Sequence, residues 1–186
     1  MLHLSMPLPE WARTSVGNSG IFAGDAEKMA FAISLARSNV EEGTGGPFGA
    51  AIFNRESGEL VSVGVNLVVA GMNSVLHAEM VAIMAAEAVL GTYTLAVRGR
   101  FELFSSCEPC AMCLGGILWS GVERLVCAAA ADDARAIGFD EGPVYPESYC
   151  YLKERGIEIE RGFMREEGKR VLELYRERGG ILYNRR

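Results

Sequence analysis

Two short stretches of the chain, His77-Ala78-Glu79 and Pro109-Cys110-Ala111-Met112-Cys113, carry the residues that the fold must bring together. They offer one imidazole and two thiolates, a ligand set found in catalytic zinc sites that keep a fourth position open for water. The carboxylate of Glu79 can accept a proton from such a water. The two stretches therefore predict a catalytic zinc site with the ligands His77, Cys110 and Cys113.

The two cysteines indicate a helix that begins at the second stretch. Cys110 and Cys113 are three residues apart and therefore share one face of a helix. Pro109 suits the first helical position, because the N–H that proline lacks is not needed there. The free N–H groups and the dipole at a helix N-terminus favour thiolate over thiol. We therefore expect both ligand sulfurs in the first helical turn.

The histidine stretch indicates a second helix. His77 and Glu79 precede an apolar run at residues 80–90, and we expect Asn73 or Ser74 to be the N-cap of the helix that this run forms. Residues two apart do not face each other within a helix, so both side chains can reach one ion only from the first turn. The zinc ion is therefore expected between two helix N-termini.

The cysteines also allow other interpretations. A C-x-x-C pair alone can be a redox pair, but His77 and Glu79 favour a metal site. A structural zinc site normally has four protein ligands and would not need Glu79. Cys107 is the nearby candidate for a fourth ligand, and we interpret it as a buried thiol beside the site. Cys127 and Cys150 are assigned no chemistry.

Length and composition indicate one domain in a reducing compartment. The chain has 186 residues, of which 49% are hydrophobic, which is enough for one full core. The five cysteines are odd in number and no basic and apolar leader opens the chain, so we expect a cytoplasmic protein. Charges or glycines interrupt the longest apolar runs before they reach the length that crosses a bilayer. We therefore expect no membrane partner.

The charge of the chain bears on its substrate. The formal net charge is −6 and the sequence pI is about 5.1, whereas binding a long polyanion depends on lysine and arginine to neutralise phosphates. Basic residues do gather after residue 160, but glutamates are interleaved with them, which is typical of a solvated helix face. We therefore expect a small-molecule substrate and no nucleic acid.

Hydrophobic periodicity predicts alternating helices and strands. Residues 1–24 show no periodicity and are expected to form an irregular arm, and residues 25–186 are expected to form a single domain. Helices are predicted at 25–39, from about 77 to 90, at 110–119, after 146 and at 165–178, and strands at 48–53, 60–65, 101–105, 124–129 and 157–163. This order predicts an α/β fold in which helices cover both faces of a sheet.

Motifs along most of the chain from residue 25 resemble the cytidine deaminase superfamily, in which H-x-E followed by P-C-x-x-C is the zinc signature. They are Gly46-Pro47-Phe48-Gly49-Ala50, Asn66, His77-Ala78-Glu79 and Ser106-Cys107-Glu108-Pro109-Cys110-Ala111-Met112-Cys113. Within the superfamily the chain resembles the bacterial guanine deaminases. That narrower resemblance rests on Phe48, on Asp133-Ala134-Arg135-Ala136-Ile137-Gly138-Phe139-Asp140-Glu141 and on Tyr183 in the C-terminal tail.

The resemblance implies a fold and an activity. The fold is a three-layer α/β/α arrangement around a mixed sheet of about five strands. One zinc ion per chain lowers the pKa of a bound water to about 7. Glu79 takes the proton of that water, passes it to a ring nitrogen and helps to protonate the departing amine. In guanine the attacked carbon is C2, and the products are xanthine and ammonia.

The resemblance also implies which residues bind the base. Phe48 stacks on the purine, Asn66 hydrogen-bonds its ring edge, and the backbone N–H of Ala78 is a further donor. Glu141 accepts from the N–H groups of guanine and relays protons to the leaving amine, although residues 140–143 taken alone also fit a polar turn. Trp119 is expected to pack near the pocket.

Members of the superfamily that this chain resembles pair through the helices that carry the zinc ligands. We therefore expect a homodimer, in which Gly115-Gly116 permits close approach of the two copies. The C-terminal segment of such proteins can reach over the active site of the partner. Tyr183 is then expected to complete a site in trans.

Other activities within the superfamily stay open as alternatives. A tRNA adenosine deaminase shares both zinc motifs, but it is expected to have a basic surface and a small or branched apolar residue in place of Phe48, and the acidic pI points away from it. A deaminase of cytosine, or of an aminotriazine such as ammeline, is the second alternative, because ammeline and guanine share an amidine edge.

Overall fold

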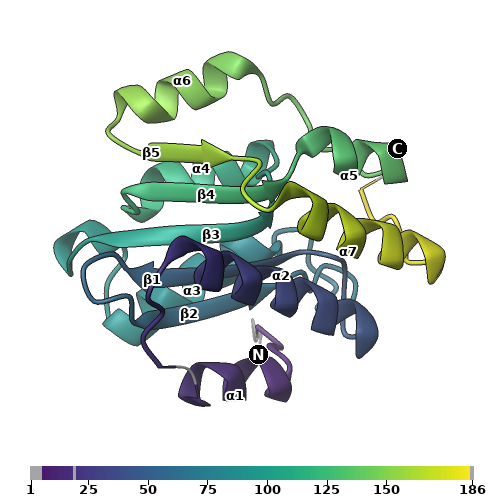
Figure 1. The fold of residues 1–186 in the computed structure, drawn as a ribbon, viewed down its shortest axis with the longest axis horizontal. Coiled ribbons are helices and arrows are strands. Elements are labelled where there is room, and N and C mark those ends of the chain that lie inside the picture. Colours follow the sequence, from purple (N-terminus) through teal and green to yellow (C-terminus); the bar gives the residue numbers. More distant parts are fainter. Residues whose placement is uncertain (1–5, 19, 185–186) are drawn as a thin grey trace, which may run out of the picture.

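The computed structural model, which describes residues 6–18 and 20–184, has a five-stranded sheet between layers of helices (Figure 1). The order β2-β1-β3-β4-β5 places β1 at the second position, antiparallel to both of its neighbours, whereas β3, β4 and β5 are parallel. This arrangement confirms the predicted α/β/α fold with a mixed sheet. The strands are β1 (Gly49–Asn54), β2 (Leu60–Val65), β3 (Phe101–Cys107), β4 (Arg124–Ala129) and β5 (Glu158–Arg161).

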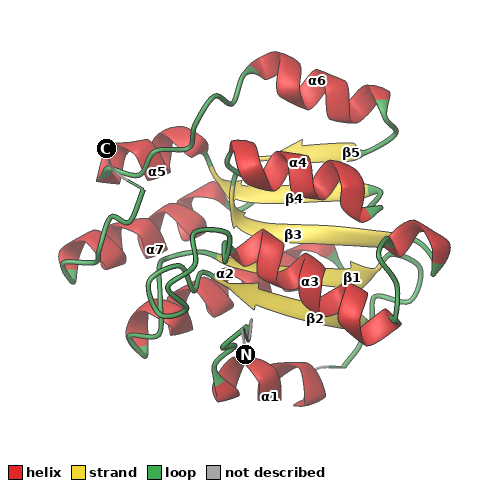
Figure 2. Cartoon of the chain, turned by 180° about the vertical axis from the view of Figure 1, so that it is seen from behind, coloured by secondary structure: helices red, strands yellow, loops and turns green. Residues whose placement is uncertain are grey.

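Helices cover both faces of the sheet. One face carries α2 (Asp25–Glu41) and α7 (Arg165–Glu177), and the other carries α3 (Ala78–Leu90) and α4 (Ala111–Ser120), as Figure 2 shows from behind. Each layer buries its own apolar cluster against the sheet. The remaining helical elements lie at the edges and ends of the sheet: α1 (Glu10–Asn18), η1 (Leu95–Val97), α5 (Ala131–Ile137) and α6 (Pro146–Glu154).

Two helices were not predicted. The arm at residues 1–24 was expected to be irregular, but Glu10–Asn18 forms α1, which packs against β2 and buries Ala12 completely. Short helices of this kind depend on tertiary packing more than on their own periodicity, which is why the sequence pattern missed it. The second is α5, a short helix packed against α7. Residues 1–5 and 19 of the predicted arm lie outside the described residues.

Strand direction places the two predicted ligand stretches at one edge of the sheet. Both β2 and β3 are antiparallel to β1, so they run in the same direction. Because α3 follows β2 and α4 follows β3 on the same face, both helices begin at the same edge (Figure 2). Gly64 permits this packing, since a Cβ there would lie 2.0 Å from the carbonyl oxygen of Ala78. The two predicted ligand stretches therefore lie at adjacent helix N-termini, and the metal expected between them stays a prediction.

The helix caps differ from the prediction. The N-cap of α3 is His77 and not Asn73 or Ser74, and the N-cap of α4 is Cys110, so Pro109 precedes the helix. Both cap residues have extended backbones, with ψ of 157° at His77 and 173° at Cys110. The chain therefore turns into each helix at a ligand residue, which directs that side chain toward the open helix end.

The stretch Ala78–Val97 has the length and the apolar composition of a membrane span, contrary to our expectation that no run reaches this length. Its helix α3 has 13 residues and ends before Gly91, which adopts a left-handed backbone with φ of 61°. Thirteen helical residues extend about 20 Å, less than the roughly 30 Å of a bilayer core. Since α3 packs against β1 and β2 and places the buried Glu79 in the interior, it is a core helix of this domain.

Candidate active site

The three predicted ligand side chains come together where α3 and α4 begin. The Sγ atom of Cys110 lies 3.4 Å from Nδ1 of His77 and 3.6 Å from Sγ of Cys113, and the distance from Cys113 Sγ to that nitrogen is 3.7 Å. A tetrahedral zinc ion places such ligand atoms about 3.5 to 3.8 Å apart, given its bond lengths to nitrogen and sulfur. The donor set and its spacing therefore fit zinc with three protein ligands.

Cys107, the candidate for a fourth ligand, stays out of the cluster. The Sγ atom of Cys107 points to the carbonyl oxygen of Ala130 at 3.8 Å, and the thiol is buried. Among the described residues, the metal-binding cluster consists of His77, Cys110 and Cys113, whose ligand atoms all lie within 4.8 Å of one another. This agrees with the interpretation of Cys107 as a neighbouring buried thiol.

The two ligand cysteines are electrostatically unequal. The hydrogen bond from Cys113 and the contact with His77 lower the pKa of Cys110 to about 4. The hydrogen bond to Cys110 and burial raise the pKa of Cys113 well above its usual value. The pair therefore keeps one proton at neutral pH. A cation that binds both sulfurs has to displace that proton, because metal ligands must be deprotonated.

Glu79 lies beside the cluster but is not part of it. Its side chain is buried, with one oxygen 3.2 Å from the hydroxyl of Ser105, which donates to it, and the other 3.3 Å from Sγ of Cys113. Burial, followed by the charge of Cys110, raises the pKa of the carboxyl. A carboxyl group held in this way can take up and release a proton. Ser105 was missed by sequence reasoning, although a polar residue inside the apolar strand β3 was a signal.

Phe48 and Asn66 stand side by side just beyond the paired ends of β1 and β2. The N–H of Asn66 donates to the carbonyl of Phe48 at 3.0 Å. The side chain of Asn39 donates to the carbonyls of Gly46 and Asn66 at 2.8 and 2.9 Å. The ring of Phe48 packs edge-on against Phe139, with ring centroids 5.0 Å apart. The two predicted base-binding residues are thus held rigidly at one wall of the site.

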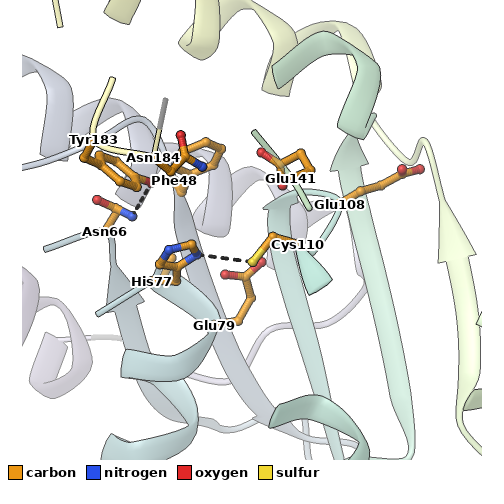
Figure 3. A pocket seen from close by; sticks show the side chains of 10 residues that line it. Phe48, Asn66, His77, Glu79, Glu108, Cys110, Glu141, Tyr183 and Asn184 are labelled. Atoms are coloured by element: carbon orange, nitrogen blue, oxygen red, sulfur yellow. Dashed lines mark hydrogen bonds between the residues drawn. The ribbon is translucent and has the colours of Figure 1, made fainter. Parts of the chain in front are cut away.

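Glu141 forms another wall of the site, as Figure 3 shows. Its side chain is buried, and its carbonyl accepts a hydrogen bond of 3.0 Å from Ala111, the first residue of α4. Burial raises the pKa of the carboxyl to about 8, and the charges of Cys110 and Glu79 add to the effect. Glu141, which was predicted to accept hydrogen bonds from the base, therefore lies in the same pocket as the candidate zinc ligands. A place in a polar turn is compatible with a role in the site.

The C-terminal tail lies over the site of its own chain. The hydroxyl of Tyr183 accepts a hydrogen bond of 2.7 Å from Nδ2 of Asn66, and its ring packs edge-on against His77. The side chain of Asn184 exchanges hydrogen bonds with the backbone of Asp140. In this single chain the tail reaches the site in cis, and the expectation that Tyr183 completes the site of a partner stays a prediction. Asn184 was missed by sequence reasoning, and its place next to Tyr183 was the available signal.

The closed tail leaves little room in the pocket. The free volume among the pocket residues is about 20 Å³, which is enough for about one water molecule. A larger cavity of about 590 Å³ adjoins this pocket and shares His77, Cys110, Glu141, Tyr183 and Asn184 with it. The inner pocket has to widen before it can hold a base. The pocket is lined by Phe48, Asn66, His77, Ala78, Glu79, Glu108, Cys110, Glu141, Tyr183 and Asn184.

Two further predicted contacts have different outcomes. Ala78 is buried and lines the pocket as the first residue of α3, so its N–H is one of the four that no helical carbonyl can satisfy. Trp119 is 77% exposed and does not line the pocket, so the predicted contact with the substrate is not formed. The reason is helical phase: Cys113 and Ile117 face inward from α4, and Trp119 is on the outer side.

Comparison with known proteins agrees with this geometry. The family model of the cytidine and deoxycytidylate deaminase zinc-binding region matches residues 24–129. A guanine deaminase from Bacillus subtilis (strain 168) is 40% identical over 126 residues, which cover 68% of this chain and 78% of that protein. The structure of a guanine deaminase from Nitrosomonas europaea has a TM-score of 0.88 and 40% identity, and the match covers 95% of this chain and 97% of that chain. A structure in complex with 2,6-diaminopurine has a TM-score of 0.92 and 40% identity, covering 98% of this chain and 97% of that chain.

We expect one tightly bound zinc ion per chain. The variant His77→Ala should lose it because a ligand is removed, whereas Cys107→Ser should keep it because this thiol lies outside the cluster. Metal content of purified protein, measured by elemental analysis after expression with added zinc, tests both variants against the wild type. Loss of zinc from Cys107→Ser, with zinc retained in His77→Ala, would show that the ligands are wrongly assigned.

Proposed function

The chain belongs to the cytidine and deoxycytidylate deaminase family, and we propose that it hydrolyses the amino group of free guanine to give xanthine and ammonia. The observation that carries this proposal is the position of Glu141. Its buried carboxyl lines the same small pocket as the ligand cluster, and Asn66 lies on the other side of His77 (Figure 3). A guanine ring presents N–H groups that can donate hydrogen bonds to a carboxyl group at this place.

The polar groups of the pocket complement guanine on more than one edge. Glu79 and Glu141 supply acceptors for the ring N–H and the amino group, whereas Nδ2 of Asn66 and the N–H of Ala78 supply donors for ring nitrogens and the carbonyl oxygen. Phe48 offers an apolar ring for stacking. Each buried polar atom of the base then has a partner, which a site must provide because unpaired buried groups cost about 1 to 3 kcal/mol each.

The chain supplies the proton transfers of the reaction. His77, Cys110 and Cys113 would hold the zinc ion, which would supply a Lewis acid that acidifies water at neutral pH. Glu79 takes a proton from the attacking water and gives it to a ring nitrogen next to C2. As the bond between C2 and the amine nitrogen breaks, the second proton of the attacking water passes from the C2 hydroxyl through Glu79 and Glu141 to the leaving amine. One water is consumed and one ammonia is released for each guanine converted.

The closed tail favours a free base over a nucleic acid. Tyr183 and Asn184 line both the inner pocket and the larger cavity, and both are joined to pocket walls by hydrogen bonds. A single base can replace the Tyr183 hydroxyl as the hydrogen-bond partner of the Asn66 amide. A tRNA loop would need this tail to be removed and a basic surface to bind its phosphates. The net charge of −6 does not favour such a surface.

We also propose a cytoplasmic homodimer. The packed helices α3 and α4 each expose a large apolar side chain, Val89 at 70% and Trp119 at 77%, which supports pairing of two copies through these helices. Gly116 permits a close contact inside the chain, between α4 and α3, because a Cβ there would lie 2.5 Å from Sδ of Met80. All five cysteines lie within the described residues and are unpaired, which supports a reducing compartment.

The substrate is tested by ammonia release from a panel. Zinc-loaded wild-type protein should release ammonia from guanine in preference to cytosine, ammeline and adenosine-containing tRNA, because guanine matches both carboxyl groups and both N–H donors. Chromatography should identify xanthine as the other product. A clear preference for cytosine or for tRNA adenosine would place the chain in another branch of the family.

The two carboxyl groups are tested by substitution. Glu141→Ala should keep zinc and fold but lose most activity on guanine, with about 1 to 3 kcal/mol lost from binding in addition to the loss of proton relay. Glu79→Gln should also keep zinc, and should lower the rate by roughly 10² to 10⁴ because proton transfer is lost. Steady-state kinetics and metal content are measured on the same preparations. Near-normal turnover of either variant would remove that residue from the mechanism.

The dimer is tested on the outer face of the helices. Wild-type protein should be a dimer by light scattering, and Trp119→Glu should shift it toward the monomer, because a charge on this face cannot be buried without a partner. Ile21→Glu places a charge at another exposed apolar residue, in the segment that leads into α2 on the opposite face of the sheet, and should leave the dimer intact. A monomeric wild-type protein with full activity would contradict the proposal.

A further inference from the structure

Glu108 is a buried residue that the mechanism does not use. It lies two residues before the ligand Cys110, and its carboxyl group points away from the pocket (Figure 3). Both oxygens are bonded: Oε1 accepts from Nε of Arg161 at 2.7 Å, and Oε2 accepts from Nη2 of Arg161 at 3.0 Å. The N–H of Ala131 also donates to Oε2 at 3.1 Å. The carboxyl group is therefore fixed by three donors from distant segments of the chain.

Arg161 is itself held in place. It is the last residue of β5 and pairs in register with Cys127 of β4. Its guanidinium lies 4.3 Å from the centre of the Tyr149 ring, so it stacks on an aromatic face as well as forming the ion pair. Two parallel N–H to oxygen bonds between a guanidinium and a carboxylate also fix orientation, which a single bond does not.

The fixed position of Glu108 reaches Cys110 through a short and rigid connection. The N–H of Glu108 donates to the carbonyl of Ala129 at 2.8 Å, so the pairing of β3 with β4 continues up to this residue. Pro109 follows, and its ring restricts φ. On the other side of Cys110, the N–H of Ala111 donates to the carbonyl of Glu141 at 3.0 Å. The ligand therefore sits between two anchored neighbours.

We propose that Arg161 is a positioning residue for the metal ligand Cys110, which it holds in place through Glu108, and that this contact sets how fast the protein loses zinc. The proposal rests on the zinc site proposed above. Without Arg161, the carboxylate of Glu108 is left buried with one backbone donor, and an unpaired buried charge moves toward water or draws water in. Either change displaces the segment that carries Cys110. Residues that orient metal ligands in this way typically contribute 10 to 100-fold to metal affinity.

A second ion pair in the chain provides a matched control. Arg165 donates to Asp133 through Nε at 2.8 Å and Nη2 at 3.0 Å. In the control pair the side chain of Arg165 is 50% exposed and that of Asp133 is 8% exposed. In the other pair the side chain of Arg161 is 48% exposed and that of Glu108 is 5% exposed. Asp133 likewise accepts from a backbone N–H, that of Ala130. The two pairs differ in their distance along the chain from the metal site: Glu108 lies two residues before Cys110, whereas Asp133 does not adjoin a metal ligand.

The experiment measures zinc release from the holoenzyme. Zinc-loaded wild type, Arg161→Gln and Arg165→Gln are mixed with excess chelator, and the release of zinc is followed by absorbance. Arg161→Gln should release zinc about 10 to 100 times faster than wild type, and Arg165→Gln should release it at the wild-type rate. Thermal unfolding of both zinc-loaded variants should show similar losses of stability. A structural role alone would therefore not separate them.

Two further measurements keep the outcome decisive. In protein loaded with cobalt in place of zinc, the visible thiolate spectrum should change in Arg161→Gln and not in Arg165→Gln. If Arg161→Gln does not fold, Arg161→Lys and Arg165→Lys replace the pair, because lysine keeps the charge but not the two parallel bonds. Equal release rates in the two variants, or a wild-type rate in Arg161→Gln, would overturn the positioning role while leaving the zinc site intact. A wild-type protein that binds no zinc would overturn both.

Discussion

The structure depends on one geometric constraint, which is that ligand atoms from two helix N-termini must lie within 4.8 Å of one another. The sheet satisfies it because β2 and β3 both run antiparallel to β1 and send α3 and α4 along the same face. Glycines at the contacts allow the close approach: Gly64 under α3 and Gly116 between α4 and α3 have no room for a Cβ. The helix dipoles then favour the anionic sulfurs and the carboxylate that gather there.

Around this cluster, several buried polar side chains have partners from distant parts of the chain. Asn39 of α2 holds the segments of Phe48 and Asn66, Ser105 of β3 donates to Glu79, and Arg161 of β5 neutralises Glu108. In a region of low dielectric constant, an unpartnered polar group is costly, and a partnered one is rigid. The order of the site therefore comes from α2, β3 and β5 as much as from α3 and α4. The carboxyl groups of Glu79, Glu108 and Glu141 lie near the two thiols. The region is therefore suited to bind a cation and a base rich in N–H donors.

The C-terminal tail connects access to the site with its chemistry. With Tyr183 bonded to Asn66, the donor that a base would use is occupied, and the inner pocket holds about one water. In the proposed reaction, a base that enters would replace the Tyr183 hydroxyl as the hydrogen-bond partner of Asn66, so opening would not leave this amide unpaired. Because the Asn184 side chain bonds to the backbone of Asp140, movement of the tail also bears on the loop that carries Glu141. Access and the position of a proposed proton relay are thus linked through a few residues.

The sequence by itself determined the fold class and most of the strands, and it predicted the candidate ligands that the structure brings together. The spacing of His77 and Glu79 before one apolar run, and of Cys110 and Cys113 in another, is a local property that periodicity and helix chemistry can interpret. Strands β2 and β4 were predicted at their observed bounds for the same reason. The tertiary structure alone decided that Trp119 faces outward, that α1 is helical, that Tyr183 lies in its own site and that Arg161 supports Glu108. Each of these depends on contacts between residues far apart in the chain, such as the 53 residues that separate Glu108 from Arg161. No local pattern records which distant partner satisfies a buried charge or which face of a helix meets the sheet.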